Sequence, residues 1–299
     1  MLIEEFKAYL TNELNLSAHT VRAYGTDLRD WAEWITGGSP ENLQPESVTT
    51  ADVRMWLAEQ ARRGTGARSL RRKTQSLRAF YKYLANRQGM TANPAGEVTL
   101  AKTTRPLPSF VPPAEMEQML EKNHDGRTRF EQVRNRLMLL MLYSTGMRRA
   151  ELRDLRDEDI NFNRSELKVL GKRNKERMIP FGKELSEAIK EYIEERRRTV
   201  GTSRTERFFV REGGEPLYDK LIYNVVHKAM LEEGVHATRL SPHVMRHSFA
   251  TDMLNNGASL SAVQHLLGHE SLATTQVYTH ITYRELQQNY QHAHPRAKK

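Results

Sequence analysis

The segment VTLAKTTRPLPSFVPP, residues 98–113, interrupts the chain with four prolines and shows no hydrophobic periodicity. Proline fixes its own backbone and disfavours helix at the residue before it, so this composition is typical of an extended, semi-rigid connection. With 299 residues the chain is also long for a single hydrophobic core. We therefore expect two domains, 1–97 and 113–299, joined by a linker at 98–112.

The first of these domains is predicted to be entirely helical. Apolar residues recur at helical spacing over residues 1–14, and Ser17 and Thr49 are suited to cap a second and a third helix. Ser69 is expected to cap a fourth helix, which the Asn-Pro pair at 93–94 ends. Four short helices with polar joints predict a small all-α domain.

The second domain is predicted to be mostly helical around one small antiparallel sheet. Three strand-like segments, DINFN, ELKVLG and ERMIPF, follow one another at 159–163, 166–171 and 176–181. Further helices are expected at about 113–122, 129–144, 183–198, 217–234, 242–255, 259–267, 271–280 and 283–292. The fold class is therefore mainly α, with an all-α N-terminal domain and a mixed C-terminal domain that holds a three-stranded sheet.

Positive charge is concentrated in the last part of the first domain. The chain has a formal net charge of +9, which favours a polyanionic partner. Residues 60–96 contain nine lysines and arginines and no acidic residue, whereas a solvated helix face normally mixes both signs. We expect phosphate contacts from a helix in the DNA major groove, and the leading candidates are Arg71, Arg72, Lys73 and Arg78. A merely solvated face is the alternative.

Several other classes of protein do not fit the sequence. No apolar run approaches the length of about 18–20 residues that a membrane span needs, and the start MLIEEFKAYL carries acids where a signal peptide is basic. The chain has no cysteine, which excludes disulfides and thiolate metal sites. We expect a cytoplasmic protein.

One segment, SPHVMRHSFATDML, combines a helix start with two side chains that bind anions. Ser241 and Pro242 suit the N-cap and first positions of a helix, which places His243 in the first turn and Arg246 on the same face. Unpaired backbone N–H groups and the helix dipole favour an anion there. The segment predicts phosphate binding. His243 and His247 are four residues apart, but no third ligand is evident, so we predict neither a metal nor a cofactor.

Cleavage of a phosphodiester without a metal needs a nucleophile, cations around the phosphorane charge, and an acid for the leaving alkoxide. Tyrosine can be the nucleophile when cations surround it, although a lone tyrosine is more often a packed aromatic. The sequence offers Tyr278 as the nucleophile, and the groups that could serve it are Arg148, Lys172, His243, Arg246 and His269.

The segments TGMRRAEL, GKRNKER, PHVMRH, LLGH and YTH, in this order, resemble the active-site segments of tyrosine recombinases, and most of all those of the bacterial Xer subfamily. The likeness covers essentially the whole chain, although Arg173 stands where the family usually has glycine.

The resemblance assigns a role to each matching residue. It implies that Arg148 and Arg246 grip the scissile phosphate, and that Glu151 supports the first arginine. Lys172 would protonate the leaving 5′ oxygen, and Tyr278 would form a 3′-phosphotyrosyl bond. The histidines His243 and His269 would hydrogen-bond the phosphate and assist proton transfer.

The resemblance also implies an enzyme that performs site-specific recombination as a tetramer on two duplexes, alone or with a paralogous recombinase. Its role would be chromosome dimer resolution at a dif-like site in the bacterial nucleoid, and a DNA translocase could serve as its activator. The alternatives are a mobile-element integrase or resolvase, a type IB topoisomerase, and a non-catalytic DNA-binding relative. The last helix, with only Leu286 and Tyr290 as apolar anchors, is expected to dock into a neighbouring subunit.

Overall fold

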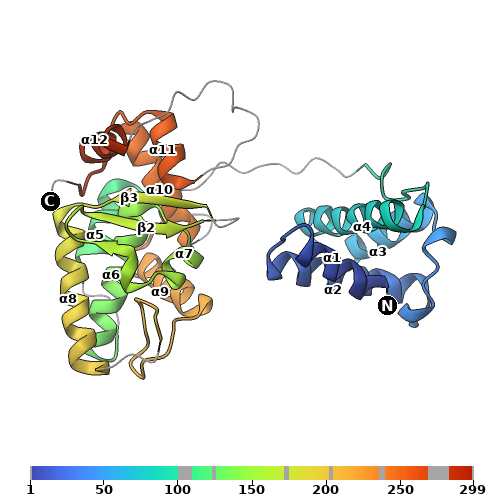
Figure 1. The fold of residues 1–299 in the computed structure, drawn as a ribbon, viewed down its shortest axis with the longest axis horizontal. Helices are drawn as coiled ribbons and strands as arrows, with labels where there is room; N and C mark the ends of the chain where they lie inside the picture. Colours follow the sequence, from blue (N-terminus) through green and yellow to red (C-terminus); the bar gives the residue numbers. More distant parts are fainter. Residues whose placement is uncertain are drawn as a thin grey trace. The chain divides into compact units, whose positions relative to one another are not determined.

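The computed structural model describes residues 2–99, 110–122, 126–171, 175–201, 205–235, 240–268 and 283–297, with Tyr283 and Arg284 described as backbone only. The chain divides into two compact units, Met1–Pro106 and Leu107–Lys299 (Figure 1). Most of the predicted linker, 98–112, lies outside the described residues, so the predicted domain limits stay predictions. No helix within the described ranges is both long enough and apolar enough to cross a bilayer.

Four α-helices form the described part of the N-terminal unit, as predicted: α1 (Leu2–Asn12), α2 (Ala18–Ile35), α3 (Thr50–Arg62) and α4 (Ala67–Gln88). Ser17 caps α2 by accepting from the Thr20 N–H at 3.3 Å, and Thr49 and Asp52 form a capping box at α3. The predicted cap at Ser69 is wrong. Helix α4 begins three residues earlier, after Gly66, because Ala67 and Arg68 are good helix formers that extend the first turn.

Aromatic residues from all four helices make the core of this unit. Trp31 is fully buried, and its ring centroid lies 6.4 Å from that of Phe80 and 6.0 Å from that of Tyr81, both nearly edge-on. Phe6 meets Phe80 edge-on at 5.5 Å, and Trp56 is also fully buried. Edge-to-face aromatic pairs at these separations stabilise a core beyond the area they bury.

A buried carboxylate, that of Asp27 on α2, changes the interpretation of α4. Lys73, predicted as a DNA contact, is only 6% exposed, and its Nζ lies 3.5 Å from Asp27 Oδ1 and 2.9 Å from Asp30 Oδ2. Its ammonium also lies 5.1 Å above the Trp56 ring. Arg72 pairs with the same Asp27 carboxylate. Lys73 is therefore a structural cation, because a buried carboxylate needs a paired charge.

The C-terminal unit is built around α6 (Arg129–Thr145), and its residues 137–145 are all buried. The sequence LMLLMLYST has almost no polar face, so this helix must be covered on every side. Helix α8 (Lys183–Val200) packs along it, with the Tyr192 ring 5.9 Å from that of Phe130. Helix α5 (Pro113–Glu121) adds Met116 and Met119 to the same core.

The predicted sheet is confirmed as three antiparallel strands in the order β1 (Ile160–Asn161), β2 (Glu166–Leu170) and β3 (Glu176–Pro180). In the β2–β3 pair, Leu167 lies opposite Ile179 and Val169 lies opposite Arg177. Leu167, Val169 and Ile179 are buried, because side chains two residues apart on a strand share one face. Arg177 is thus placed on the core side of the sheet.

The remaining helices are α7 (Arg149–Asp154), α9 (Asp219–Glu232), α10 (Pro242–Asn255), α11 (Leu260–Leu267) and α12 (Tyr283–Ala293). Three short 3₁₀ turns complete the described elements, at Pro40–Asn42, Pro45–Ser47 and Asp157–Asp159. The helix expected at 271–280 lies outside the described residues.

Helix α12 packs on its own unit. Leu286, Tyr290 and Ala293 are each at most 3% exposed, and Asn256 Nδ2 donates to the Ala293 carbonyl at 2.9 Å. We expected too few apolar residues for such packing. The segment after the helix supplies the missing burial: the ring of His294 stacks on that of Tyr290 at 5.1 Å, and its centroid lies 5.2 Å from that of Tyr143 and 5.4 Å from that of Phe249.

Acid is expected to destabilise this packing. Burial lowers the pKa of His294 from 6.5 to about 3. Between these two pH values the unfolded chain binds a proton at His294 and the folded chain does not. Stability from the neutral ring is fully present above pH 6.5 and is lost as the pH falls. Between pH 6.5 and 5 the wild type should lose about 1.5 kcal/mol more than His294→Phe, which keeps the aromatic packing. Hydrogen exchange of α6 amides measures this, and equal pH slopes would refute it.

Candidate active site

The turn between α6 and α7 places Arg148, the first candidate. Gly146 ends α6 in the left-handed region at φ +61°, and a Cβ at this position would lie 2.4 Å from Phe249 Cδ1. Both the backbone conformation and the space therefore require glycine. Thr145 Oγ1 accepts from the Met147 N–H at 3.2 Å and fixes the turn. Arg148 follows as the residue that caps α7.

Glu151, the predicted supporting acid, holds Arg148 at both its backbone and its side chain. The Arg148 N–H donates to Glu151 Oε2 at 2.6 Å, and Arg148 Nη1 donates to Glu151 Oε1 at 2.8 Å. Arg148 Nη2 donates to the Gly268 carbonyl at 3.2 Å. Burial by itself would raise the pKa of Glu151, but the hydrogen bonds and charges of Arg177 and Arg148 outweigh it and lower the pKa. Glu151 is therefore an ionised carboxylate.

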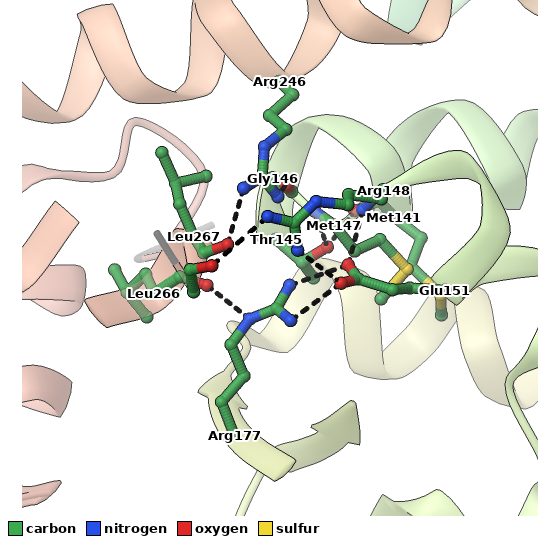
Figure 2. Close-up of polar contacts among 11 residues, drawn as sticks. Met141, Thr145, Gly146, Met147, Arg148, Glu151, Arg177, Arg246, Leu266 and Leu267 are labelled. Carbon is green, nitrogen blue, oxygen red and sulfur yellow. Dashed lines mark hydrogen bonds and ion pairs between the residues drawn. The ribbon is translucent and has the colours of Figure 1, made fainter. Parts of the chain in front are cut away.

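Arg177 on β3 is a further residue of the site that was not predicted from the sequence. Its side chain is 7% exposed, and it forms a bidentate pair with Glu151 at 2.9 Å and 2.7 Å (Figure 2). Its Nε donates to the Leu266 carbonyl at 2.7 Å. The signal was available in the sequence, because strand alternation puts Arg177 on the same face as buried Ile179. A charge at such a position needs a buried partner.

Arg246 on α10 is the second arginine of the site. Its guanidinium is buried and donates to two main-chain carbonyls, those of Gly146 at 2.6 Å and Leu267 at 2.5 Å. Burial, followed by the neighbouring charge of Arg148, lowers its pKa to about 10, although Glu151 opposes this. Arg246 remains a cation at neutral pH, although its burial makes the charged form unfavourable in free energy.

His243 begins the same helix, where Ser241 and Pro242 hold the predicted N-cap and first positions. Its side chain is exposed at the surface of the unit. Partial burial and then the cations around it, first His247 and Arg149, lower its pKa, so the imidazole is neutral at neutral pH. A neutral imidazole can both donate and accept a hydrogen bond.

In Figure 2 the guanidinium groups of Arg148 and Arg177 pair with the Glu151 carboxylate, and the guanidinium of Arg246 lies beside that of Arg148. Among the residues drawn there, Glu151 offsets one of the three charges, which leaves two positive charges around Arg148 and Arg246. Arginine donates in a planar fork that matches the oxygens of phosphate. The described part of the site therefore has the charge and the donors to hold a phosphate group.

Three of the predicted catalytic residues, Lys172, His269 and Tyr278, lie outside the described residues. For Lys172 and His269, the preceding residue in the chain reaches the site. Gly171 precedes Lys172, and a Cβ on it would lie 3.8 Å from Glu151 Oε1. Gly268 precedes His269, and its carbonyl accepts from Arg148.

Two family models match most of the chain. Residues 109–285 match the phage integrase family, and residues 3–88 match the N-terminal SAM-like domain of phage integrases. The chain belongs to the phage integrase family of tyrosine recombinases. The residues of the C-terminal match include those that converge in Figure 2.

Curated relatives agree along nearly the full length of this recombinase. Tyrosine recombinase XerC of Oceanobacillus iheyensis is 37% identical over 300 residues, with 99% of this chain and 97% of the relative covered. Tyrosine recombinase XerC of Anoxybacillus flavithermus is 37% identical over 295 residues, with 98% and 97% covered. The predicted enzyme class, a site-specific recombinase, is confirmed by this similarity.

A solved structure confirms the fold of this recombinase. The XerH site-specific recombinase bound to a palindromic difH substrate, in a post-cleavage complex, has a TM-score of 0.71 at 20% identity. The alignment covers 97% of this chain and 84% of that chain. The predicted architecture, mainly helical with an all-α N-terminal part and a small antiparallel sheet in the C-terminal part, is thereby confirmed.

Proposed function

We propose that this recombinase cleaves and rejoins duplex DNA through a covalent bond between Tyr278 and a 3′ phosphate. The observation that carries the proposal is the buried guanidinium of Arg246, held next to Arg148 by two main-chain carbonyls. Within the described residues it pairs with no carboxylate of its own. A buried cation held by carbonyls alone stays partly uncompensated, and a phosphate would complete its neutralisation.

The other residues would divide the reaction as follows. The Tyr278 oxygen attacks phosphorus and loses its proton, while the bond from phosphorus to the 5′ oxygen breaks. Lys172 gives that oxygen a proton, and His243 and His269 hydrogen-bond the phosphate and assist proton transfer. The number of phosphoester bonds is unchanged, so the 5′ hydroxyl of a partner strand can reverse the step without ATP.

Helix α4 is the proposed DNA-contacting helix of the N-terminal unit. Arg68, Arg71, Gln75 and Lys82 are exposed and share one side of the helix at spacings of three, four and seven residues. Arg78 lies on the same side, where it donates to the carbonyls of residues 95, 96 and 98 at 2.9, 3.1 and 2.8 Å. This side of α4 would contact phosphates along the major groove, without Lys73.

The names of the relatives support a proposal for the biological role, since XerH was solved with a difH substrate. We place this recombinase in the bacterial cytoplasm, at the nucleoid, where it would resolve chromosome dimers at a dif-like site. It would act as a tetramer on two duplexes, alone or with a paralogous recombinase, and a DNA translocase could activate it. Integration or resolution of a mobile element is the second candidate, because the Tn1549 transposon integrase has the same fold with a TM-score of 0.68.

A nicked duplex that carries a candidate dif-like site tests the chemistry. The nick lets the cleaved fragment diffuse away, so the covalent protein–DNA complex accumulates and is seen on a denaturing gel. Wild type should form this complex, and Tyr278→Phe should reduce it at least 10⁴-fold, because phenylalanine has no nucleophile. Tyr223→Phe, which removes the hydroxyl of an exposed tyrosine on α9, is the matched control and should leave the complex unchanged.

The same assay separates the alternatives. A complex that survives in Tyr278→Phe would refute the nucleophile. DNA binding without any complex in wild type would favour a non-catalytic relative. Relaxation of supercoils by a wild type that never exchanges strands between two sites would indicate a topoisomerase.

A further inference from the structure

All three guanidinium nitrogens of Arg177 donate to protein partners. Nη1 and Nη2 pair with the two oxygens of Glu151 at 2.9 Å and 2.7 Å, and Nε donates to the Leu266 carbonyl at 2.7 Å. The group is buried, so these are charge-assisted hydrogen bonds in a region of low dielectric constant. A buried guanidinium bound in this way is oriented by the protein.

The partners of Arg177 belong to the segments that carry the rest of the site. Glu151 holds Arg148 by its backbone and by its side chain. Leu266 lies in the last turn of α11, next to Leu267, whose carbonyl holds Arg246. Arg177 on β3 therefore connects the helix that positions one phosphate-binding arginine to the helix end that positions the other (Figure 2).

One glycine leaves room for this side chain. A Cβ on Gly268 would lie 3.2 Å from Arg177 Cδ, which is tighter than an ordinary contact. Gly268 is also in the left-handed region at φ +62°, where glycine is favoured. Glycine at this position thus lets the Arg177 side chain pass the end of α11 to reach Glu151.

The charges explain why a second arginine is needed behind Arg148. Glu151 accepts from Arg148 and Arg177 together, so one carboxylate is shared between two cations. Arg177 balances the desolvated carboxylate, and the lowered pKa of Glu151 follows from this pairing first. Arg148 consequently keeps more of its positive charge for a bound phosphate than it would in an exclusive pair.

We infer that Arg177 is a positioning residue for transition-state stabilisation, acting through Glu151 on Arg148 and through the end of α11 on Arg246. The inference rests on the proposed function, since it assigns Arg177 a part in the same phosphate site. Arg177 does not touch the DNA itself. Its loss would misplace the two arginines that do.

The test compares single-turnover cleavage by Arg177→Met and Arg177→Lys on two nicked duplexes. One duplex has the natural scissile phosphate and the other has a methylphosphonate there, which develops less negative charge and depends less on the arginines. Arg177→Met should cleave the phosphate about 100-fold more slowly and the methylphosphonate within about fivefold of wild type. DNA affinity should change less than threefold. Arg177→Lys should recover part of the rate, because lysine keeps the charge without the bidentate geometry.

Arg134→Met is the matched control, because Arg134 is a buried arginine of the same unit, on α6, bonded to Asn135. It should lower the melting temperature and leave both cleavage rates unchanged well below that temperature. An equal loss on both duplexes in Arg177→Met, or no loss on either, would overturn the inference. If Arg177→Met does not fold, the inference is tested with Arg177→Lys, by comparing its rate loss on the phosphate duplex with its rate loss on the methylphosphonate duplex. Failure of wild type to cleave the phosphate duplex would instead overturn the proposed function, and this inference with it.

Discussion

Replacing Arg246 by lysine is expected to slow formation of the covalent protein–DNA complex about 1000-fold, with DNA binding changed much less. Arg246 uses two of its nitrogens on the carbonyls of Gly146 and Leu267, and its remaining N–H donors are left for phosphate. A lysine ammonium is a point charge that cannot bridge both carbonyls and also present a planar fork to phosphate. Single-turnover cleavage of the nicked duplex measures the loss.

Arg196→Lys is the control for this substitution. Arg196 is another arginine of the C-terminal unit that donates to a main-chain carbonyl, that of Phe208 at 2.7 Å, and it also pairs with Asp157. Its replacement by lysine should leave the cleavage rate within about threefold of wild type. If Arg246→Lys also stayed within threefold, Arg246 would not be a transition-state contact.

Gly146→Ala should be the most damaging small substitution in the C-terminal unit. The added methyl group would meet Phe249 Cδ1 at 2.4 Å and Leu267 Cδ2 at 2.9 Å, and the backbone at φ +61° disfavours alanine. Left-handed strain and overpacking together should cost about 2–4 kcal/mol of unfolding free energy. The rate of cleavage should fall as well, because the Gly146 carbonyl holds Arg246.

Gly234→Ala separates the two causes. Gly234 is also left-handed, at φ +64°, but a Cβ there would meet no atom within 4 Å, so only the strain of about 1 kcal/mol should appear. Hydrogen exchange of α6 amides reports on the C-terminal unit. Tryptophan fluorescence is an internal reference, because Trp31, Trp34 and Trp56 all belong to the N-terminal unit and their transition should not move. Equal losses in the two variants would show that contact with Phe249 is unimportant.

The parts of this structure that sequence could predict are those governed by local chemistry. Ser17 and Thr49 cap helices because each satisfies N–H groups within its own first turn. Arg148 and Arg246 were identifiable because a phosphate needs cations and because their motifs stand next to helix termini. The order of the five motifs identified the family, which no single motif could have done.

The parts that sequence could not predict depend on partners far away in the chain. Lys73 looked like a surface cation among many, and only the packing of α2 against α4 brings Asp27 to it. Arg177 has its partners 26 and 89 residues away, so no local pattern specifies them. Helix α12 looked too polar to pack on its own unit. The burial of His294 and Arg296, which follow the helix, depends on tertiary packing that no local pattern specifies.

Arg148 and Arg246 both contact main-chain carbonyls that lie far away in the chain, and this bears on when during synthesis the enzyme can cut DNA. Arg246 reaches back 100 residues to Gly146, and Arg148 reaches forward 120 residues to Gly268. The N-terminal unit has its own core and can form while the ribosome is still adding the rest. The proposed phosphate site is completed later, because Arg148 and Arg246 each gain one of their carbonyl partners, those of Gly268 and Leu267, only after the end of α11 has been made and packed. During synthesis the chain would therefore complete its N-terminal helical unit first and its proposed phosphate site last, so an unfinished chain would not yet be able to cleave DNA.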